Sequence, residues 1–308
     1  MNAQRTIFEV DLVPMAGRRF QPTGFPDLGA AEFDTPDGVK ALLVESPQSM
    51  ANRLESMTWD EARANQVEAL APLPYVRIVS SDGAFLSSSR LEAHRLASAY
   101  IMQGKADGKD GKDWMLAKLG LVAGRPLDYR AIAKACFAID PVSLIHGVFF
   151  ARKEWPWQPK IARAVTSFIE AYDVIPAVSG GVKKDAVVNE GKEGATTEGY
   201  GMVPYHRVEY VAGAIKAYFV IDRQQFRSYG LSEPATALLE ALAEFEIASL
   251  LDGGLRLRTA CDLVMRARPD GLSDAQDAAS RIAKAAVDCA AELGSVTEVV
   301  WSGRGKAS

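Results

Sequence analysis

The chain has 308 residues, of which 48% are apolar and 24% are charged. This composition is typical of a folded globular protein and excludes an intrinsically disordered, collagen-like or disulfide-scaffold chain. The length leaves room for about two average domains, or for one domain with large insertions. No apolar run approaches the roughly 18 residues needed to cross a bilayer. The first ten residues carry Arg5 and Glu9 and no apolar signal core. We therefore expect a cytoplasmic protein with no membrane partner.

The charged and potentially metal-binding residues give no strong functional signal. There are 35 Lys and Arg residues against 39 Asp and Glu residues, a formal net charge of −4, which neither supports nor excludes a groove for a polyanion. The three cysteines lie far apart without CxxC spacing and are expected to be buried free thiols: Cys136, Cys261 and Cys289. The three histidines are equally scattered: His94, His146 and His206. We expect no metal and no cofactor.

Apolar periodicity and capping residues predict the following elements in chain order. The first half has a strand over Thr6–Val13, an irregular stretch over Pro14–Pro36, a strand over Val39–Val44, a helix capped by Ser46 with Pro47 at its first position, a strand over Tyr75–Val79, a helix from Ser89 toward Met102, and a helix over Asp128–Phe137. The Ser89–Glu92 spacing fits a capping box. The second half has strands over Val142–Phe150, Arg163–Val174 and Arg207–Ile221, a helix over Pro234–Leu251, a strand over Leu255–Val264, a helix over Asp274–Leu293 and a strand over Thr297–Trp301.

Two stretches are not typical of packed structure. Residues 103–113 are mostly Gly, Lys and Asp and predict a mobile surface insert. Ser179–Gly201 contains six glycines and three lysines and lies between two predicted strands. A structureless excursion of that length is usually functional or disordered. Together the elements predict an α+β domain with helices on one face of a sheet.

No catalytic signature is present, because the sequence lacks GxGxxG, P-loop, GxSxG and HExxH motifs. Polar helix starts are present instead. Gln48 and Asn52 share one helix face near its N-terminus, which is a favourable place for an anion. Ser89 and Arg90 form a second polar start, and Arg256 and Arg258 alternate along one strand. Ordinary capping and solvation would explain the same residues.

Four strings of residues carry a resemblance to a known family: Leu43–Glu55, Ser88–Arg95, Ile145–Ala151 and Gly253–Thr259. In this order they resemble the backbone RAMP subunit of the type I-U (I-G) CRISPR Cascade complex, and the resemblance runs from Thr6 to the final helix. These strings are typical of the family and indicate kinship rather than chemistry.

The resemblance implies a single domain over residues 1–308, a modified RRM-like (ferredoxin-like) palm with large insertions. It implies a non-catalytic subunit, not an enzyme, whose copies stack along a CRISPR RNA and present it to target DNA beside other Cascade subunits. Related subunits have a projecting thumb that displaces one nucleotide per segment. Residues 176–203 lie in the right place for that thumb.

The aromatic RNA-stacking motif of RRM domains is absent, so we expect sequence-neutral contacts with the RNA backbone. The candidate RNA-binding residues are Arg18, Arg19, Gln48, Asn52, Arg53, Ser89, Arg90, His94, Lys160, Arg163, Lys183, Lys184, Arg256 and Arg258.

Two other functions stay open at this point. One is a RAMP-type endoribonuclease that processes CRISPR RNA with His94, His146 or His206 as acid or base. The other is a structural oligomer without any RNA contact.

Overall fold

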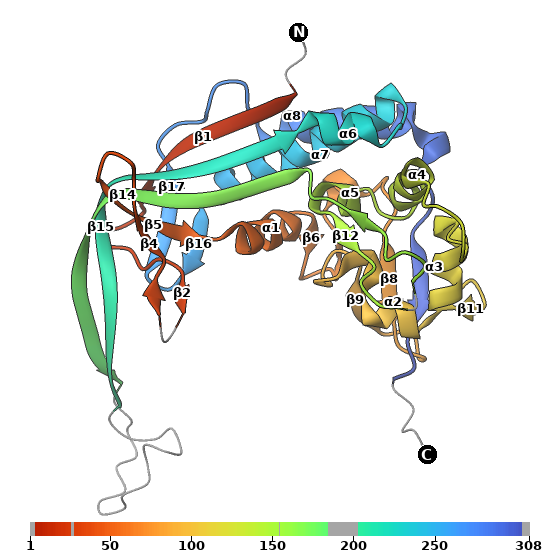
Figure 1. Ribbon diagram of the computed structural model, residues 1–308, viewed down its shortest axis with the longest axis horizontal. Helices are drawn as coiled ribbons and strands as arrows, with labels where there is room; N and C mark the ends of the chain where they lie inside the picture. Colours follow the sequence, from red (N-terminus) through yellow and green to blue (C-terminus); the bar gives the residue numbers. More distant parts are fainter. Residues whose placement is uncertain (1–3, 26–27, 154, 184–202, 304–308) are drawn as a thin grey trace, which may run out of the picture.

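The computed structural model describes residues 4–25, 28–153, 155–183 and 203–303. These residues form a mixed α+β fold around an antiparallel seven-stranded sheet (Figure 1). The strands of this sheet, in spatial order, are β16 (Leu255–Arg258), β17 (Cys261–Met265), β1 (Arg5–Pro14), β15 (Val203–Asp222), β14 (Val165–Lys183), β5 (Lys40–Glu45) and β4 (Glu32–Asp34).

Alternation of apolar and polar residues fixes which face of this sheet is buried. Phe8, Val10 and Leu12 of β1 are buried, whereas Ile7, which precedes Phe8 and points to the opposite face, is 63% exposed. The β1–β15 register places Phe8 opposite Phe219, which is also buried. A shift by one residue would turn every one of these side chains to the other face, so the pattern specifies the register.

Helices form much of the rest of the core. They are α1 (Pro47–Ser56), α2 (Ala99–Gln103), α3 (Gly111–Leu119), α4 (Tyr129–Ile139), α5 (Val142–His146), α6 (Arg223–Ser228), α7 (Glu233–Asp252) and α8 (Ala275–Asp288), with 3-10 turns η1 (Glu68–Leu70), η2 (Arg95–Ala97) and η3 (Ala290–Glu292). α7 is buried along nearly its whole length and packs against α8, whose buried stripe includes Ala278, Ile282 and Ala285. No described helix has the length and apolarity needed to span a membrane.

A second, five-stranded sheet has the order β11 (Lys109–Asp110), β10 (Lys105–Ala106), β18 (Thr297–Val300), β8 (Val76–Val79) and β9 (Phe85–Ser88). The remaining strands form two-stranded ribbons: β2 (Gly24–Phe25) with β3 (Gly29–Ala30), β6 (Trp59–Asp60) with β7 (Asn65–Gln66), and β12 (Val148–Phe149) with β13 (Lys160–Ile161). The stretch predicted to be irregular, Pro14–Pro36, therefore contains three short strands.

The second sheet corrects the interpretation of residues 103–113 as an unpacked insert. β10 and β11 form a hairpin, and Lys105 pairs with Val300 of β18. Ala106 and Gly111 are buried, and the indole of Trp114 donates a hydrogen bond to Asp107 over 2.9 Å. The Gly and Asp residues form the tight turn of this hairpin, so their spacing reflects turn chemistry rather than an absence of structure.

Three further elements differ from the predictions. The helix predicted from Ser89 begins only at Ala99, with Ser98 as its N-cap. The strand predicted over Val142–Phe150 begins as the helix α5, because the Asp140 carboxylate accepts a hydrogen bond from the Val142 amide and starts a turn. A short apolar run buried on all sides does not distinguish helix from strand. The strand predicted over Leu255–Val264 is the β16–β17 hairpin.

β14 and β15 continue as a pair well beyond the sheet and project from the body (Figure 1). Their register runs to Lys183 opposite Val203, so the described ends of the predicted thumb, 176–183 and 203, belong to a long antiparallel ribbon. Asp173 has a φ of +54° and interrupts β14 opposite Gly213. A Cβ at Gly213 would lie 2.9 Å from the Asp173 carboxylate, so glycine permits this irregularity. Residues 184–202 lie outside the described part of the chain.

Candidate nucleic-acid interface

A hollow with a volume of about 540 Å³ lies where four segments meet: the start of α1, η2, the β12–β13 ribbon and the start of β14. We call it the basic groove. Its polar and aromatic lining is Gln48, His94, Arg95, His146, Phe149, Lys160, Arg163 and Thr166. No Asp or Glu is among the described residues that line it. Four of the residues predicted to bind RNA therefore meet in one hollow: Gln48, His94, Lys160 and Arg163.

The start of α1 forms one side of the basic groove. Ser46 caps the helix by accepting a hydrogen bond from the Ser49 amide, and Pro47 occupies the first helical position, as predicted. Gln48 is exposed on this first turn, and Asn52 is exposed one turn further along the same side. These two amide side chains can donate to and accept from a ligand without adding charge.

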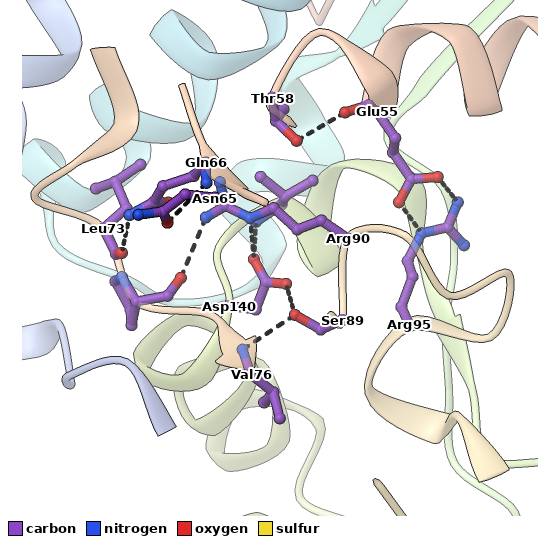
Figure 2. Close-up of polar contacts among 12 residues, drawn as sticks. Glu55, Thr58, Asn65, Gln66, Leu73, Val76, Ser89, Arg90, Arg95 and Asp140 are labelled. Carbon is purple, nitrogen blue, oxygen red and sulfur yellow. Dashed lines mark hydrogen bonds and ion pairs between the residues drawn. The ribbon is translucent and has the colours of Figure 1, made fainter. Parts of the chain in front are cut away.

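A buried ion pair fixes the floor of the groove. Arg95 holds Glu55 of α1 with two contacts of 2.6 Å, one from Nε and one from Nη2 (Figure 2). Its Nη1 donates to the carbonyl of Gly147 over 3.1 Å. Gly147 has a φ of +78°, and a Cβ there would lie 2.7 Å from the Ile161 carbonyl. Glycine therefore lets the chain just before β12 approach β13 this closely.

The β12–β13 ribbon supplies an aromatic ring and a cation. Phe149 and Lys160 are register partners, and the Lys160 ammonium lies 5.6 Å from the centre of the Phe149 ring. Neighbouring Phe150 is buried and packs on Trp155 at 5.0 Å. Because successive strand residues point to opposite faces, burial of Phe150 turns Phe149 outward, where 46% of it is exposed.

Arg163 brings a further positive charge to the groove. Its Nη1 donates to the carbonyl of Pro47 over 3.1 Å, which ties β14 to the start of α1. Partial burial and the neighbouring Arg95 both lower the pKa of Arg163 from its usual value, but arginine stays protonated at neutral pH. Lys160 and Arg163 lack a carboxylate partner among the described residues. A polyanion would supply the missing negative charge.

The structure contradicts the assignment of Ser89 and Arg90 to the RNA-binding set. Both are buried, and Figure 2 shows their contacts. The Ser89 hydroxyl donates to Asp140 over 2.5 Å and accepts from the Val76 amide, and Arg90 contacts Asp140 and the Pro74 carbonyl. Burial raises the pKa of Asp140, and Arg90 opposes that shift. This cluster joins β8 to α5 and cannot reach a ligand.

Arg53 and Arg258 also act mainly within the chain. Both contact the buried Glu45 carboxylate, Arg258 over 2.6 Å and Arg53 over 3.4 Å. Arg53 further donates to the Leu257 carbonyl, and Arg258 to the Gln21 carbonyl. These bonds fasten the β16–β17 hairpin to β5 and α1. Arg256 is exposed beside them and is the member of this group whose side chain is available to a ligand.

The remaining candidates lie apart from the groove. Arg18 is exposed, and Arg19 pairs with the buried Glu209 at 3.3 Å, near the base of the projecting ribbon. Lys183 ends β14, but its side chain is not among those described, and Lys184 lies outside the described residues.

The histidines have different surroundings. His94 is exposed in the groove. His146 also lines the groove, but its side chain is fully buried, and its Nε2 lies 2.8 Å from the carboxylate of Glu246, which is also buried. The imidazole of His146 therefore has no surface exposed to an RNA. The His206 side chain is outside those described. Within the described residues, no three His, Cys, Asp or Glu side chains gather as a metal ion would require.

The outer face of the main sheet is a poorer surface for a polyanion. It carries stacked Phe168 and Tyr218, with ring centres 5.1 Å apart. Three carboxylates lie on the same face, those of Glu9, Asp11 and Glu170. The one ammonium near them, that of Lys216, is paired with Glu9. The negative balance disfavours phosphate there, although aromatic rings are present.

Comparison with known proteins gives the family. A family model described as CRISPR-associated protein GSU0053 matches residues 7–176, which is more than half of the chain, and the chain belongs to this family. No curated protein matches the sequence. The fold is distantly similar to a chain of a structure titled "CRISPR RNA-guided surveillance complex, pre-nicking", with 10% identity and a TM-score of 0.43 over 92% of this chain and 88% of that one. It is also distantly similar to Csc2 of Thermofilum pendens, with 13% identity and a TM-score of 0.31 over 91% of this chain and 72% of that one.

Sequence reasoning missed three polar or aromatic residues of the groove, Arg95, Phe149 and Thr166. Arg95 follows His94 in the string Ser88–Arg95, which indicates kinship rather than chemistry. Phe149 precedes another phenylalanine in a short strand, and that pair is the available signal, since only one of two adjacent strand residues can face the core.

Proposed function

We propose that the chain is a non-catalytic CRISPR RNA-binding backbone subunit of a type I Cascade complex, of the I-U (I-G) subtype. The observation that carries this proposal is the basic groove: a CRISPR-associated family member has a hollow with unpaired cations and no carboxylate among its described lining residues. Single-stranded RNA is held by positively charged grooves of this kind. The subtype rests on the four signature strings.

The strand order supports a modified RRM-like palm. Four strands of the main sheet can be numbered 1 to 4 in chain order: β1, β14, β15 and β17. Their spatial order across the sheet is then 4-1-3-2. In the sequence, α1 lies between β1 and β14, and α7 lies between β15 and β17. This is the arrangement of a ferredoxin-like unit. β4, β5, the β16 half of the hairpin and the second sheet are then the insertions.

The projecting β14–β15 ribbon is evidence for the proposed thumb and for the proposed assembly of copies. A two-stranded ribbon that leaves the sheet buries little of its own surface, so its role is more readily explained by a neighbour than by stability. We propose that copies of the chain stack along the guide, that each ribbon reaches the adjacent copy, and that the guide pairs with target DNA while other Cascade subunits bind the ends. In the cell this assembly would lie in the cytoplasm.

The test is RNA binding by the purified full-length chain. Fluorescence anisotropy with a labelled guide RNA should show binding that weakens steeply with salt, by a log–log slope of about −0.7 per phosphate contacted. Guides of unrelated sequence should bind equally, because base pairing and not the protein supplies specificity. Absence of RNA binding at low salt would overturn the proposal.

The endoribonuclease alternative is supported by one observation, the exposure of His94 in the groove. Incubation of the chain with CRISPR repeat RNA without metal tests it. The backbone proposal predicts intact RNA. Cleavage by the wild type that is lost in His94→Ala, while Lys109→Ala still cleaves, would favour the nuclease.

A further inference from the structure

We propose that the basic groove contains a nucleobase-stacking site formed by Phe149, so that one base of the RNA lies on this ring while Lys160 and Arg163 hold the adjacent phosphates. The inference rests on the proposed function and goes beyond it, because it assigns a contact to a base where the sequence predicted contacts with the RNA backbone alone.

The position of the ring is fixed by the fold. Phe149 is held by its pairing with Lys160 and by burial of Phe150 against Trp155, so its direction does not depend on its own side-chain packing. A bulky apolar side chain left 46% exposed is unremarkable by itself. Its surroundings are informative, because the ring lines the same hollow as two cations, Lys160 and Arg163, that have no carboxylate partner among the described residues.

The spacing of these groups matches a nucleotide. The Lys160 ammonium lies over the Phe149 ring, 5.6 Å from its centre. A nucleotide whose base contacts the ring would therefore have its phosphate within reach of this flexible side chain. Gln48 lies on the same hollow and offers a neutral donor and acceptor. An aromatic ring accepts every base, since each base has a flat π face, so this contact keeps the binding neutral to sequence.

The outer face of the main sheet provides an internal comparison. Phe168 and Tyr218 already stack on each other there and lie among carboxylates. Phe149 is instead free of an aromatic partner among the described residues and lies among cations. The groove therefore combines the two components of a single-strand site, an available ring and positive charge.

The experiment measures anisotropy with two labelled oligonucleotides of equal length, an oligoadenylate and its abasic ribose-phosphate counterpart. Phe149→Ala should weaken oligoadenylate binding by about 5- to 150-fold, the range for loss of one stacked base. Its affinity for the abasic strand and its salt slope should equal those of the wild type, because the phosphate contacts stay. Phe149→Tyr should restore binding, and Phe149→Leu should not. Tyr129→Ala, which removes a 53% exposed aromatic outside the groove lining, is the matched control.

The outcomes separate the two proposals. If the wild type binds neither strand, the proposed function fails and this inference fails with it. If the wild type binds both strands but Phe149→Ala binds oligoadenylate normally, only the stacking site is overturned. The same holds if Phe149→Leu binds as well as the wild type, which would indicate a generic apolar contact such as one with a second copy. Equal losses on the abasic strand would also overturn the stacking site.

Discussion

The guanidinium of Arg95 holds the carboxylate of Glu55 through two contacts of 2.6 Å, and the same guanidinium donates to the carbonyl of Gly147. Because Glu55 lies on α1 and Gly147 precedes β12, this one side chain joins the two walls of the basic groove. Both partners are largely buried, with 11% and 8% of their side chains exposed.

We expect Arg95→Met to destabilise the chain by about 3–5 kcal/mol, because it leaves the Glu55 charge buried and unpaired. The double variant Glu55→Leu/Arg95→Met should recover part of that loss, because it removes the unpaired charge as well. Urea unfolding of the single and double variants measures this. A double variant that is less stable than Arg95→Met would show that the pair is not the source of the effect.

Lys160→Ala and Arg163→Ala should each weaken binding of every RNA sequence and lower the magnitude of the log–log salt slope by about 0.7. Arg256→Ala should weaken all guides alike for the same reason. Lys109→Ala, which removes an exposed cation from the second sheet, serves as the control. Salt-dependent anisotropy checks these variants. Slopes unchanged in both groove variants would place the phosphates elsewhere.

The three cysteines should be unreactive in the folded chain. All are buried, and burial raises the pKa of Cys136 to about 12 from its usual 9.0. A thiol with a raised pKa in the folded state contributes stability that is complete below pH 9. That contribution is lost as pH rises toward 12, since the unfolded chain ionises first. Ellman's reagent at pH 8 should react slowly until urea unfolds the chain. The fall in unfolding free energy between pH 9 and 10.5 should be shallower in Cys136→Ala.

Replacement of residues 184–202 by a short Gly-Ser linker should leave the thermal midpoint nearly unchanged. The Lys183–Val203 pair that closes the described ribbon is retained, and shortening a connection alters its closure entropy only slightly. Ordered assembly on guide RNA should be lost. Differential scanning fluorimetry and electron microscopy on one preparation measure both. Regular filaments formed by the shortened chain would place the contact between copies elsewhere.

The sequence predicted elements more successfully than it predicted which polar residues would meet. Strands such as β1, and helices such as α1 and α8, follow from alternation, capping and apolar stripes, which are local properties. Ser89 fits a capping box locally, but Asp140, fifty-one residues away, takes its hydroxyl instead. Gln48, His94 and Lys160 come from three separate elements, and only their packing forms the groove. Position along the chain could not separate Lys160, which is free to bind, from Arg90, which is buried.

The account's central claim is that copies of this chain assemble along a guide RNA. Mass photometry of the full-length chain mixed with two guide RNAs, one twice the length of the other, tests it most directly. We expect discrete complexes whose number of protein copies rises in proportion to RNA length. A single copy per RNA at both lengths, or particles of the same mass with and without RNA, would contradict the claim.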